Sequence, residues 1–477
     1  MKKIDTKAKS LILGLLLFIC GFIVCITLLF DSNSPTHYIF LPFMPLVFAV
    51  CCILFSDILC YVPQNLGVTI LLVLLFIRTV LTPFVMFMGS YKSVVYLNVE
   101  SNTTPAIFLI IWETISVFLA VFLYLKKKGT KTGETKLVED ISNHKSLKKY
   151  FIFVLIAFSV LLVCDIIAPE MMSSYRNIFD IGNEHFTSFE DSDIVKKYGT
   201  TFLKKFAIVL GRYIARALIL LIPACIIVFL SYKKKPIYKL LGFCVCFAPM
   251  FFIAGGIARS LIYIVCLLLL YTNCSNVGMP SFKQLLPLGL GGVFVIWWWL
   301  FRDDPGSVWS FMSARLNAYF SGVNIVSGGF NLPSALEYRI RYFLNDFTGT
   351  IPFGGTIFGI SYAPVQSFFN LANGTSGQIP PAISMGNYYL GPIFAPIYSV
   401  VFALLAVNSG IQLRNNKNMH PMKYIRLLVS VFQFSMGVVM YNIEITMTAV
   451  FSLILPMYII ERLSYKKPSR SNINNDT

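Results

Sequence analysis

Long apolar runs constrain this chain more than any other feature of its sequence. A helix needs about 20 predominantly apolar residues to cross the hydrocarbon core of a bilayer. Twelve such runs can be placed, at residues 11–30, 38–60, 66–88, 105–126, 149–168, 202–230, 237–254, 256–272, 284–301, 386–410, 424–440 and 443–461. The chain is 56% hydrophobic and only 13% charged, too little polar surface for a soluble protein of 477 residues. We therefore predict an all-α, polytopic integral membrane protein with about twelve transmembrane helices.

The basic residues are distributed in a way that predicts topology. Lysine-rich clusters alternate with the apolar runs, at residues 2–3, 126–131, 145–149, 233–235, 414–426 and 462–470. Because positively charged loops stay on the cytoplasmic side, both termini are predicted to be cytoplasmic. The run at 11–30 then becomes the first membrane helix and not a removable signal peptide. The net charge of +17 is explained by this topology, and no nucleic-acid partner is predicted.

This topology divides the chain into three parts. Residues 1–301 hold the first nine membrane helices, with a cytoplasmic loop near 125–149 and an outer loop near 169–201. Residues 302–385 form one large extracytoplasmic loop, and residues 386–477 hold the last three helices and a cytoplasmic tail. The four histidines are scattered and the eleven cysteines follow the spans, so we predict no metal site. Glycine-rich nucleotide loops are also missing, and no cofactor is predicted.

The large loop opens with FRDDPGSVWSFMSARLNAYF, which predicts a helix over residues 307–320 after a break at Asp304-Pro305-Gly306. Arg315 falls within the broad apolar face of this helix. Its head group either reaches out to water or lipid phosphate, or faces a cavity and meets an anionic ligand. Arg302 is a further candidate for anion binding. Asp303 and Asp304 either cap the helix or supply a catalytic base.

A second loop helix is predicted over residues 333–347, with Pro333 in its first turn. Glu337 and Arg341 are four residues apart, which favours a surface ion pair, although Glu337 is also a candidate base. Arg339 has no nearby acid and stays a candidate for substrate binding. Residues 348–385 are rich in Gly, Pro, Ser, Thr and Asn, which indicates either ordinary turns or a lid suited to sugars.

Four arginines and no lysine occur between Arg302 and Met385. A guanidinium presents a rigid fork of donors that matches phosphate oxygens, whereas an ammonium acts as a point charge. Arginine also occurs within the predicted spans, where charged groups usually face a cavity or a partner. Arg212 and Arg216 are four residues apart, and Arg259 lies near the outer end of its helix. Arg78 has Glu113 as a candidate ion-pair partner. The arginines toward the outer leaflet suit a phosphorylated lipid headgroup.

The architecture and two sequence stretches, ARLNAYFSGVNIV and SGQIPPAISMGNYYLGPIFAPIYSV, resemble bacterial oligosaccharide repeat-unit polymerases of capsule, exopolysaccharide and O-antigen synthesis. The specific part of this resemblance is confined to roughly residues 300–400. It implies a GT-C-like glycosyltransferase in the cytoplasmic membrane of a bacterium. Its substrates would be undecaprenyl-diphosphate-linked oligosaccharides, and its partners membrane lipid, a flippase and a chain-length regulator. We then expect Arg315, Arg212 and Arg216 to converge on the lipid diphosphate.

Two other functions remain as alternatives. The related O-antigen ligases use arginines and a histidine in their outer loop, and this chain has no histidine between residues 186 and 419. A lipid-linked oligosaccharide flippase or other transporter would also have many spans and cavity arginines. Such proteins are typically built from internal repeats, and no repeat is visible in this sequence.

Overall fold

The computed structural model describes residues 2–62, 64–91, 100–128, 144–169, 199, 201–231, 235–249, 257–274, 308–358, 364–375, 377–415 and 420–464. Within these residues all regular structure is helical, and no β-strand occurs. Nine described helical segments are long and apolar enough to cross a membrane. They are Ser10–Leu29, Thr36–Leu54, Leu66–Met88, Thr103–Lys128, Lys148–Ile167, Phe202–Ser231, Ile397–Arg414, Pro421–Val439 and Ile443–Leu463. The chain is thus a multi-pass, all-α membrane protein, as predicted.

The chain folds as two compact units. Unit 1 comprises Met1–Glu134, Pro280–Asn415 and Ser430–Thr448. Its membrane-crossing helices begin with α1 (Lys2–Leu29), α2 (Phe43–Leu54), α3 (Leu66–Phe76), the π-helical turn η3 (Ile77–Leu81), α4 (Thr82–Met88) and α5 (Thr103–Lys128). They continue with α20 (Ile397–Asn415), part of α21 (Pro421–Val439) and α22 (Ile443–Ala449). The 3-10 turns η1 (Thr36–Tyr38), η2 (Ser56–Tyr61) and η4 (Glu100–Asn102) connect the first of them.

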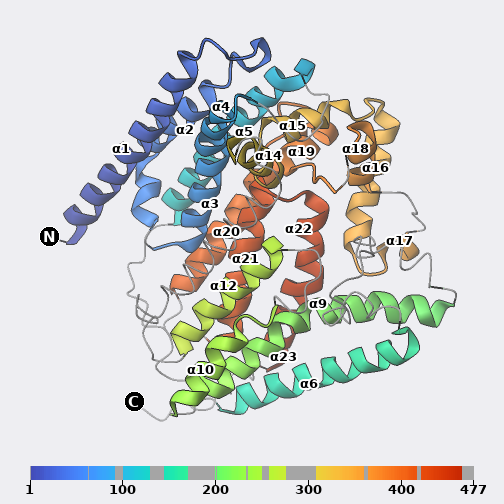
Figure 1. Cartoon of the computed structure of the whole chain (residues 1–477). Coiled ribbons are helices and arrows are strands. Elements are labelled where there is room, and N and C mark those ends of the chain that lie inside the picture. The colour runs from blue at the N-terminus through green and yellow to red at the C-terminus, as the bar shows by residue number, and fades with distance from the viewer. Residues whose placement is uncertain are drawn as a thin grey trace. The chain divides into compact units, whose positions relative to one another are not determined.

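Unit 1 also contains a set of short helices between residues 308 and 390, which we call the inter-span segment. These are α14 (Val308–Tyr319), α15 (Val323–Gly328), η7 (Gly329–Asn331), α16 (Leu336–Thr350), α17 (Gly354–Ile357), α18 (Val365–Ala372) and α19 (Ala382–Leu390). Within the unit, α14 packs on α4, and α15 and α19 pack on α5. In Figure 1 these helices lie beside the α4–α5 end of the unit. The inter-span segment is therefore attached directly to the membrane helices.

A buried apolar cluster makes this attachment. Val323 and Val326 of α15 and Ile383 of α19 join Ile107 and Ile110 of α5 in one core. Close packing of these side chains gains van der Waals contacts, which hold helices together in a membrane as well as in water. The helices of the inter-span segment consequently have a fixed position on the spans that carry them.

Close backbone contact joins α3 to α20 within unit 1. A β-carbon added at Gly67 would lie 2.4 Å from the carbonyl oxygen of Ala406, so only glycine fits there. Asn65 caps α3, because its Oδ1 accepts hydrogen bonds from the N–H groups of Gly67 and Val68. The amide of Asn65 also donates to the Val407 carbonyl at 3.1 Å, which fixes the cap to α20.

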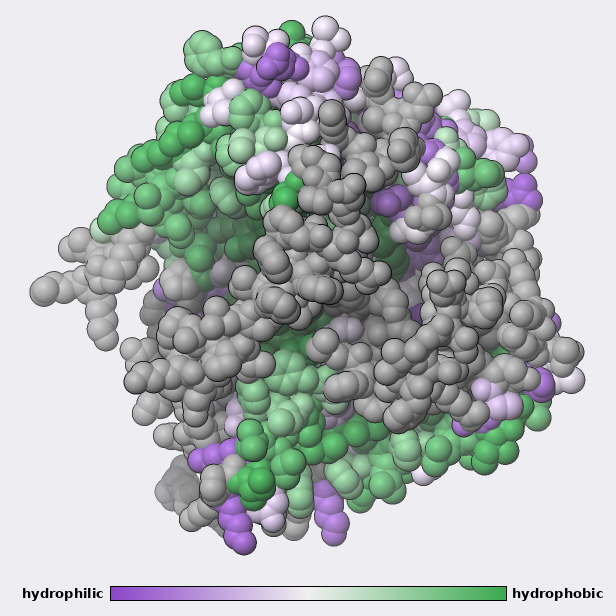
Figure 2. Space-filling view, viewed as in Figure 1, coloured by the Kyte–Doolittle hydropathy of each residue, from purple (hydrophilic) through white to green (hydrophobic). Residues whose placement is uncertain are grey.

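Unit 2 comprises Thr135–Met279, Asn416–Val429 and Ala449–Thr477. It contains α6 (His144–Ile167), α9 (Phe202–Ser231), α10 (Pro236–Val245), α12 (Ile257–Cys274), the remainder of α21, the π-helical turn η8 (Val450–Ile454) and α23 (Leu455–Ser464). Helix α9 packs against α6, α10 and α12. Arg426 of α21 pairs with Glu461 of α23 at 2.7 Å. Figure 2 shows hydrophobic side chains on the visible surface of the helices in both units, which is typical of spans that face lipid.

Some predicted boundaries are wrong. The run at 386–410 is two helices, because α19 ends at Leu390 and Gly391 has a φ of +82° before Pro392, so the span begins at Ile397. The run at 237–254 contains α10, only ten residues long, followed by turn residues at 246–248, and residues 250–254 lie outside the described part of the chain. The run at 256–272 agrees within two residues with α12. The run at 284–301 lies outside the described residues.

Candidate functional site

The predicted site residues fall in different parts of the structure. Arg302, Asp303 and Asp304 lie outside the described residues. The backbone of Arg259 belongs to the first turn of α12. Arg212 and Arg216 are half-buried, one turn apart on α9 of unit 2. Their convergence with Arg315 of unit 1 stays a prediction.

Helix α14 occurs where it was predicted, and it is oriented with its polar face inward. Its buried residues are Ser313, Ala314 and Asn317, and the large apolar residues of the predicted face are half-buried or exposed. The side chains on the inward face are small because the helix approaches α4 closely, with Gly89 against the backbone of Ser310. Arg315 is exposed on this outward side, and its guanidinium lies 5.0 Å from the centre of the Phe311 ring.

Helix α16 begins and ends three residues later than predicted, so Pro333 precedes the helix instead of lying in its first turn. Glu337 lies in the first turn and is exposed. The predicted ion pair between Glu337 and Arg341 is not among the ion pairs of the described residues. Arg339 and Arg341 are both half-buried.

The buried acid of the inter-span segment is Asp346, on the inward face of α16. Its side chain is only 5% exposed. The Tyr389 hydroxyl of α19 donates to Asp346 Oδ2 at 2.7 Å, and the Val365 N–H at the start of α18 donates to Oδ1 at 3.1 Å. No cation forms an ion pair with Asp346 within the described structure. The carboxylate is thus held between three short helices by two hydrogen bonds.

A second tyrosine, Tyr388, lies close enough to Asp346 to feel the charge of the acid, and Arg339 contacts this tyrosine. The guanidinium of Arg339 lies 5.8 Å from the centre of the Tyr388 ring, and Tyr388 is the chain neighbour of Tyr389. The Tyr388 hydroxyl and Arg339 Nε are both buried, and neither has a hydrogen-bond partner in the structure. Buried polar atoms without partners are rare in proteins, and they indicate a place for water or a ligand. Asp346, Tyr389, Tyr388 and Arg339 together form what we call the Asp346 site.

The environment of the site changes the acidity of its groups. Burial raises the pKa of Asp346 from 3.8 to about 6, although the hydrogen bonds from Tyr389 and Val365 oppose this shift. Burial also raises the pKa of Tyr388 to about 12, with the nearby Tyr342 and Asp346 adding to the shift and Arg339 opposing it. The pKa of Tyr389 is raised by burial and by the charge of Asp346. A carboxyl group with a pKa near neutrality is suited to proton transfer.

The predicted pairing of Arg78 with Glu113 is confirmed. Both side chains are fully buried within the spans of unit 1, and Arg78 Nη1 lies 2.5 Å from Glu113 Oε2. Arg78 Nε also donates to the Ser321 carbonyl at 3.0 Å, and the Ser399 hydroxyl donates to Glu113 Oε1. This ion pair thus joins η3, α5 and α20 to the turn between α14 and α15.

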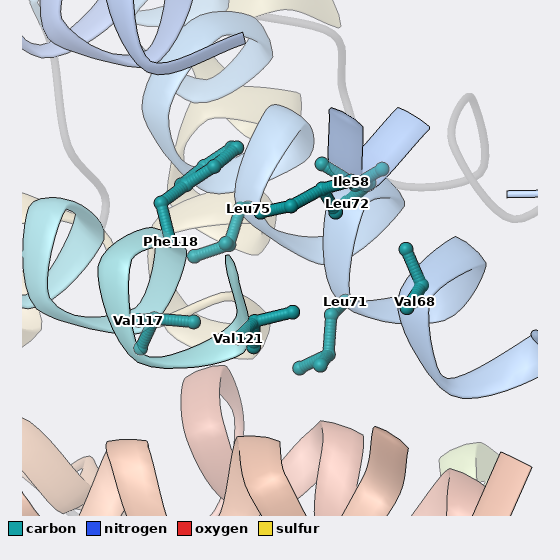
Figure 3. Close-up of a pocket in the computed structure, with 8 residues that line it drawn as sticks. All are labelled: Ile58, Val68, Leu71, Leu72, Leu75, Val117, Phe118 and Val121. Atoms are coloured by element: carbon teal, nitrogen blue, oxygen red, sulfur yellow. The ribbon is translucent and has the colours of Figure 1, made fainter. Parts of the chain in front are cut away.

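A cavity of different character lies among η2, α3 and α5 (Figure 3). Its volume is small, about 20 Å³, and its eight lining residues are all Ile, Leu, Val or Phe. Figure 3 shows Val117, Phe118 and Val121 of α5 facing the leucines of α3 across this space. Because the lining has no polar side chain, the cavity offers no group for catalysis or for binding a charged ligand.

No group of three or more His, Cys, Asp or Glu side chains in the described part of the chain could hold a metal ion. No protein-family model matches the chain, and no curated protein or solved structure matches it significantly.

Sequence reasoning identified Arg339 and missed Asp346. Arg339, Tyr342 and Asp346 occur at positions i, i+3 and i+7, which share one face of a helix. The predictions for this helix covered Glu337, Arg339 and Arg341 and did not include Asp346. The spacing itself was the signal that could have found the site.

Proposed function

We propose that this protein polymerises undecaprenyl-diphosphate-linked oligosaccharide repeat units into a surface polysaccharide on the outer face of the cytoplasmic membrane. The observation that carries the proposal is the buried carboxyl group of Asp346, in the same group of short helices as the unpartnered polar atoms of Tyr388 and Arg339. The sequence resemblance of residues 300–400 to the repeat-unit polymerases supports the same function.

The proposed reaction is a glycosyl transfer. A hydroxyl oxygen of the acceptor sugar forms a bond to the anomeric carbon of the growing glycan, and the bond from that carbon to the diphosphate oxygen breaks. The hydroxyl proton goes to the Asp346 carboxylate, which acts as general base. Undecaprenyl diphosphate leaves with the bonding electron pair.

Arginines would stabilise the charge that develops on this leaving group, because fixed donors in a site of low dielectric favour the transition state. Arg339 is the arginine that the described contacts connect to the Asp346 site. Asp346 replaces Glu337 as our choice of base among the described acids, since Glu337 is exposed. Asp303 and Asp304 lie outside the described residues, and their role stays a prediction.

The test is reconstitution of the purified full chain with a lipid-diphosphate repeat unit as the only substrate. We expect longer glycans and one undecaprenyl diphosphate released for each new linkage. A ligase would instead require a second, different acceptor. Proteoliposomes that move the lipid-linked unit across the bilayer without lengthening it would overturn the proposal in favour of a flippase.

The transporter alternative has one observation in its favour, the Arg78–Glu113 pair within the spans. Ionisable residues at membrane depth frequently belong to transport pathways.

Labelling can test the topology that polymerisation requires. A single cysteine at the exposed position Ser334, in a chain otherwise free of cysteine, should react with an impermeant thiol reagent in intact cells. Reaction only after lysis would place the Asp346 site on the cytoplasmic side.

A further inference from the structure

Helix α16 is amphipathic, and its orientation is the reverse of that expected in water. Its buried residues are all polar or aromatic: Tyr342, Asn345, Asp346, Thr348 and Thr350. Its exposed apolar residues are Leu336, Ile340, Phe343, Leu344 and Phe347. Leu336 is 70% exposed and Ile340 is 52% exposed. A surface helix in contact with water would turn this stripe toward the protein core.

The apolar stripe of α16 leads to a membrane span of the same unit. The Phe343 ring packs edge-on against Tyr389 of α19, with 5.4 Å between the ring centres. Leu390 follows Tyr389, and the exposed Ile393 and Phe394 then lead into α20. Exposed apolar residues continue along that span at Ile397 and Val401. The outward face of a span is covered by lipid, so the surface continuous with it is expected to meet lipid as well.

The residues that flank the stripe are those found at membrane interfaces. Arg339 and Arg341 lie on either side of the stripe, and both are half-buried. Helix α14 also exposes aromatic side chains, Trp309 and Tyr319. Aromatic and basic side chains are enriched at the headgroup level, because one end of each is apolar and the other polar.

We propose that the apolar face of α16 is embedded in the membrane, at the boundary between headgroups and acyl chains. A helix of 15 residues is about 22 Å long, too short to cross the bilayer and suited to lie in its plane. Asp346 lies on the buried side of this helix, on the face that it shares with Arg339. A substrate carried by a lipid would then reach the Asp346 site laterally, without leaving the membrane.

Spin labelling of the full-length protein in phospholipid vesicles tests this placement. A nitroxide is attached to a single cysteine at Ile340, in a chain otherwise free of cysteine, and its collisions with oxygen and with a water-soluble nickel chelate are measured. Oxygen is concentrated in the hydrocarbon and the chelate in water. Leu123, exposed on α5, is the lipid control, and Ser32, exposed in the turn after α1, is the water control.

We expect the ratio of oxygen to chelate collisions at Ile340 to resemble the ratio at Leu123, several-fold above that at Ser32. Leu344 is labelled as a second position in case the first variant does not fold. Frequent collisions with the chelate would mean that the stripe faces water. Rare collisions with both reagents would mean that protein covers it, and dipolar broadening that disappears on dilution with unlabelled chain would identify a second copy. Each of these three results would overturn the proposal, and none depends on enzymatic activity.

Discussion

Glu113 and Asp346 are both buried acids of unit 1, and they differ in what surrounds them. Glu113, among the spans, has the guanidinium of Arg78 and the hydroxyl of Ser399 as partners. Asp346, in the inter-span segment, has a tyrosine hydroxyl and one backbone N–H. An ion pair compensates the cost of burying a charge, whereas neutral donors compensate it only in part.

The comparison separates two roles that burial alone does not distinguish. The carboxylate of Glu113 is held by a fixed cation, which keeps the spans and the α14–α15 turn together. The carboxyl group of Asp346 is held by neutral donors with a pKa near 6, so small changes in its surroundings can move a proton. We therefore assign a structural role to the first acid and a chemical role to the second.

Replacing Asp346 by Asn should have the largest effect on polymerisation. The amide keeps the shape of the side chain but cannot accept the proton of the acceptor hydroxyl. We expect a loss of about 10²- to 10⁴-fold in the rate of linkage formation, measured with purified protein and lipid-linked repeat units. Asp57→Asn, at an exposed acid of η2, is the matched control and should be close to wild type. Full activity of Asp346→Asn would place the base elsewhere.

Breaking the Arg78–Glu113 pair should affect stability first. Glu113→Gln or Arg78→Met leaves one buried charge without its partner, which costs about 3–5 kcal/mol. The double replacement Arg78→Met with Glu113→Leu removes both charges and should restore much of the loss. Thermal unfolding in detergent measures both effects. Single variants that unfold like the wild type but lose activity would give this pair a chemical role and favour a transport function.

Arg339→Lys tests whether the cation beside Tyr388 acts on the leaving group. Lysine keeps the charge but loses the planar fork, and we expect about a hundredfold loss of polymerisation, equivalent to about 3 kcal/mol. The matched control is Arg462→Lys, because Arg462 lies over Tyr458 in the same way, with 5.2 Å from its guanidinium to the ring centre. Arg315→Lys and Arg212→Lys test the predicted convergence on the diphosphate. Equal activity of Arg339→Lys and Arg462→Lys would contradict this assignment.

The smallest expected effect is a change of pH dependence in Tyr389→Phe. A base must be ionised, so wild-type activity should rise as pH increases through about 6 and fall in acid. The Tyr389 hydrogen bond lowers the pKa of Asp346, so its loss should move the midpoint to higher pH. We expect a loss of about 3–10-fold at pH 6 that largely disappears at pH 8. Tyr319→Phe is the control, and an unchanged midpoint in Tyr389→Phe would show that this hydroxyl does not tune the base.

The raised pKa of Asp346 also makes the stability of the folded protein depend on pH. The folded protein binds this proton more tightly than the unfolded chain, whose Asp has a pKa near 3.8. The contribution of this group to the free energy of unfolding is therefore fully present below pH 3.8 and is lost as pH rises through about 6.

Hydropathy predicted the spans because nearly every side chain of a helix that faces lipid must be apolar. Nine of the predicted runs are described as long apolar helices, and the error at 386–410 came from averaging hydropathy across Gly391 and Pro392. The pairing of Arg78 with Glu113 was predictable for a related reason. Within spans, a charged side chain has few possible partners other than a side chain of opposite charge.

The Asp346 site was less predictable, because it depends on which way a short helix faces. The sequence of α16 permits either face to be buried, and periodicity alone does not distinguish a helix in water from one at a membrane surface. The partners of Asp346 are also distant in the chain, with Val365 19 residues away and Tyr389 43 residues away. Only the packing of α16 with α18 and α19 brings them together.

The buried pair has a further consequence for the order in which the protein assembles during synthesis. Arg78 and Glu113 are 35 residues apart, so they can meet once the α5 span has been made. The Ser321 carbonyl that accepts from Arg78 is 243 residues away from it, and Ser399 is 286 residues away from Glu113. At roughly 5–20 residues per second, these partners emerge some ten seconds or more after the pair. While the chain is being made, Arg78 and Glu113 are therefore each other's first protein partners. Their hydrogen bonds with Ser321 and Ser399 form later, once these residues have been synthesised.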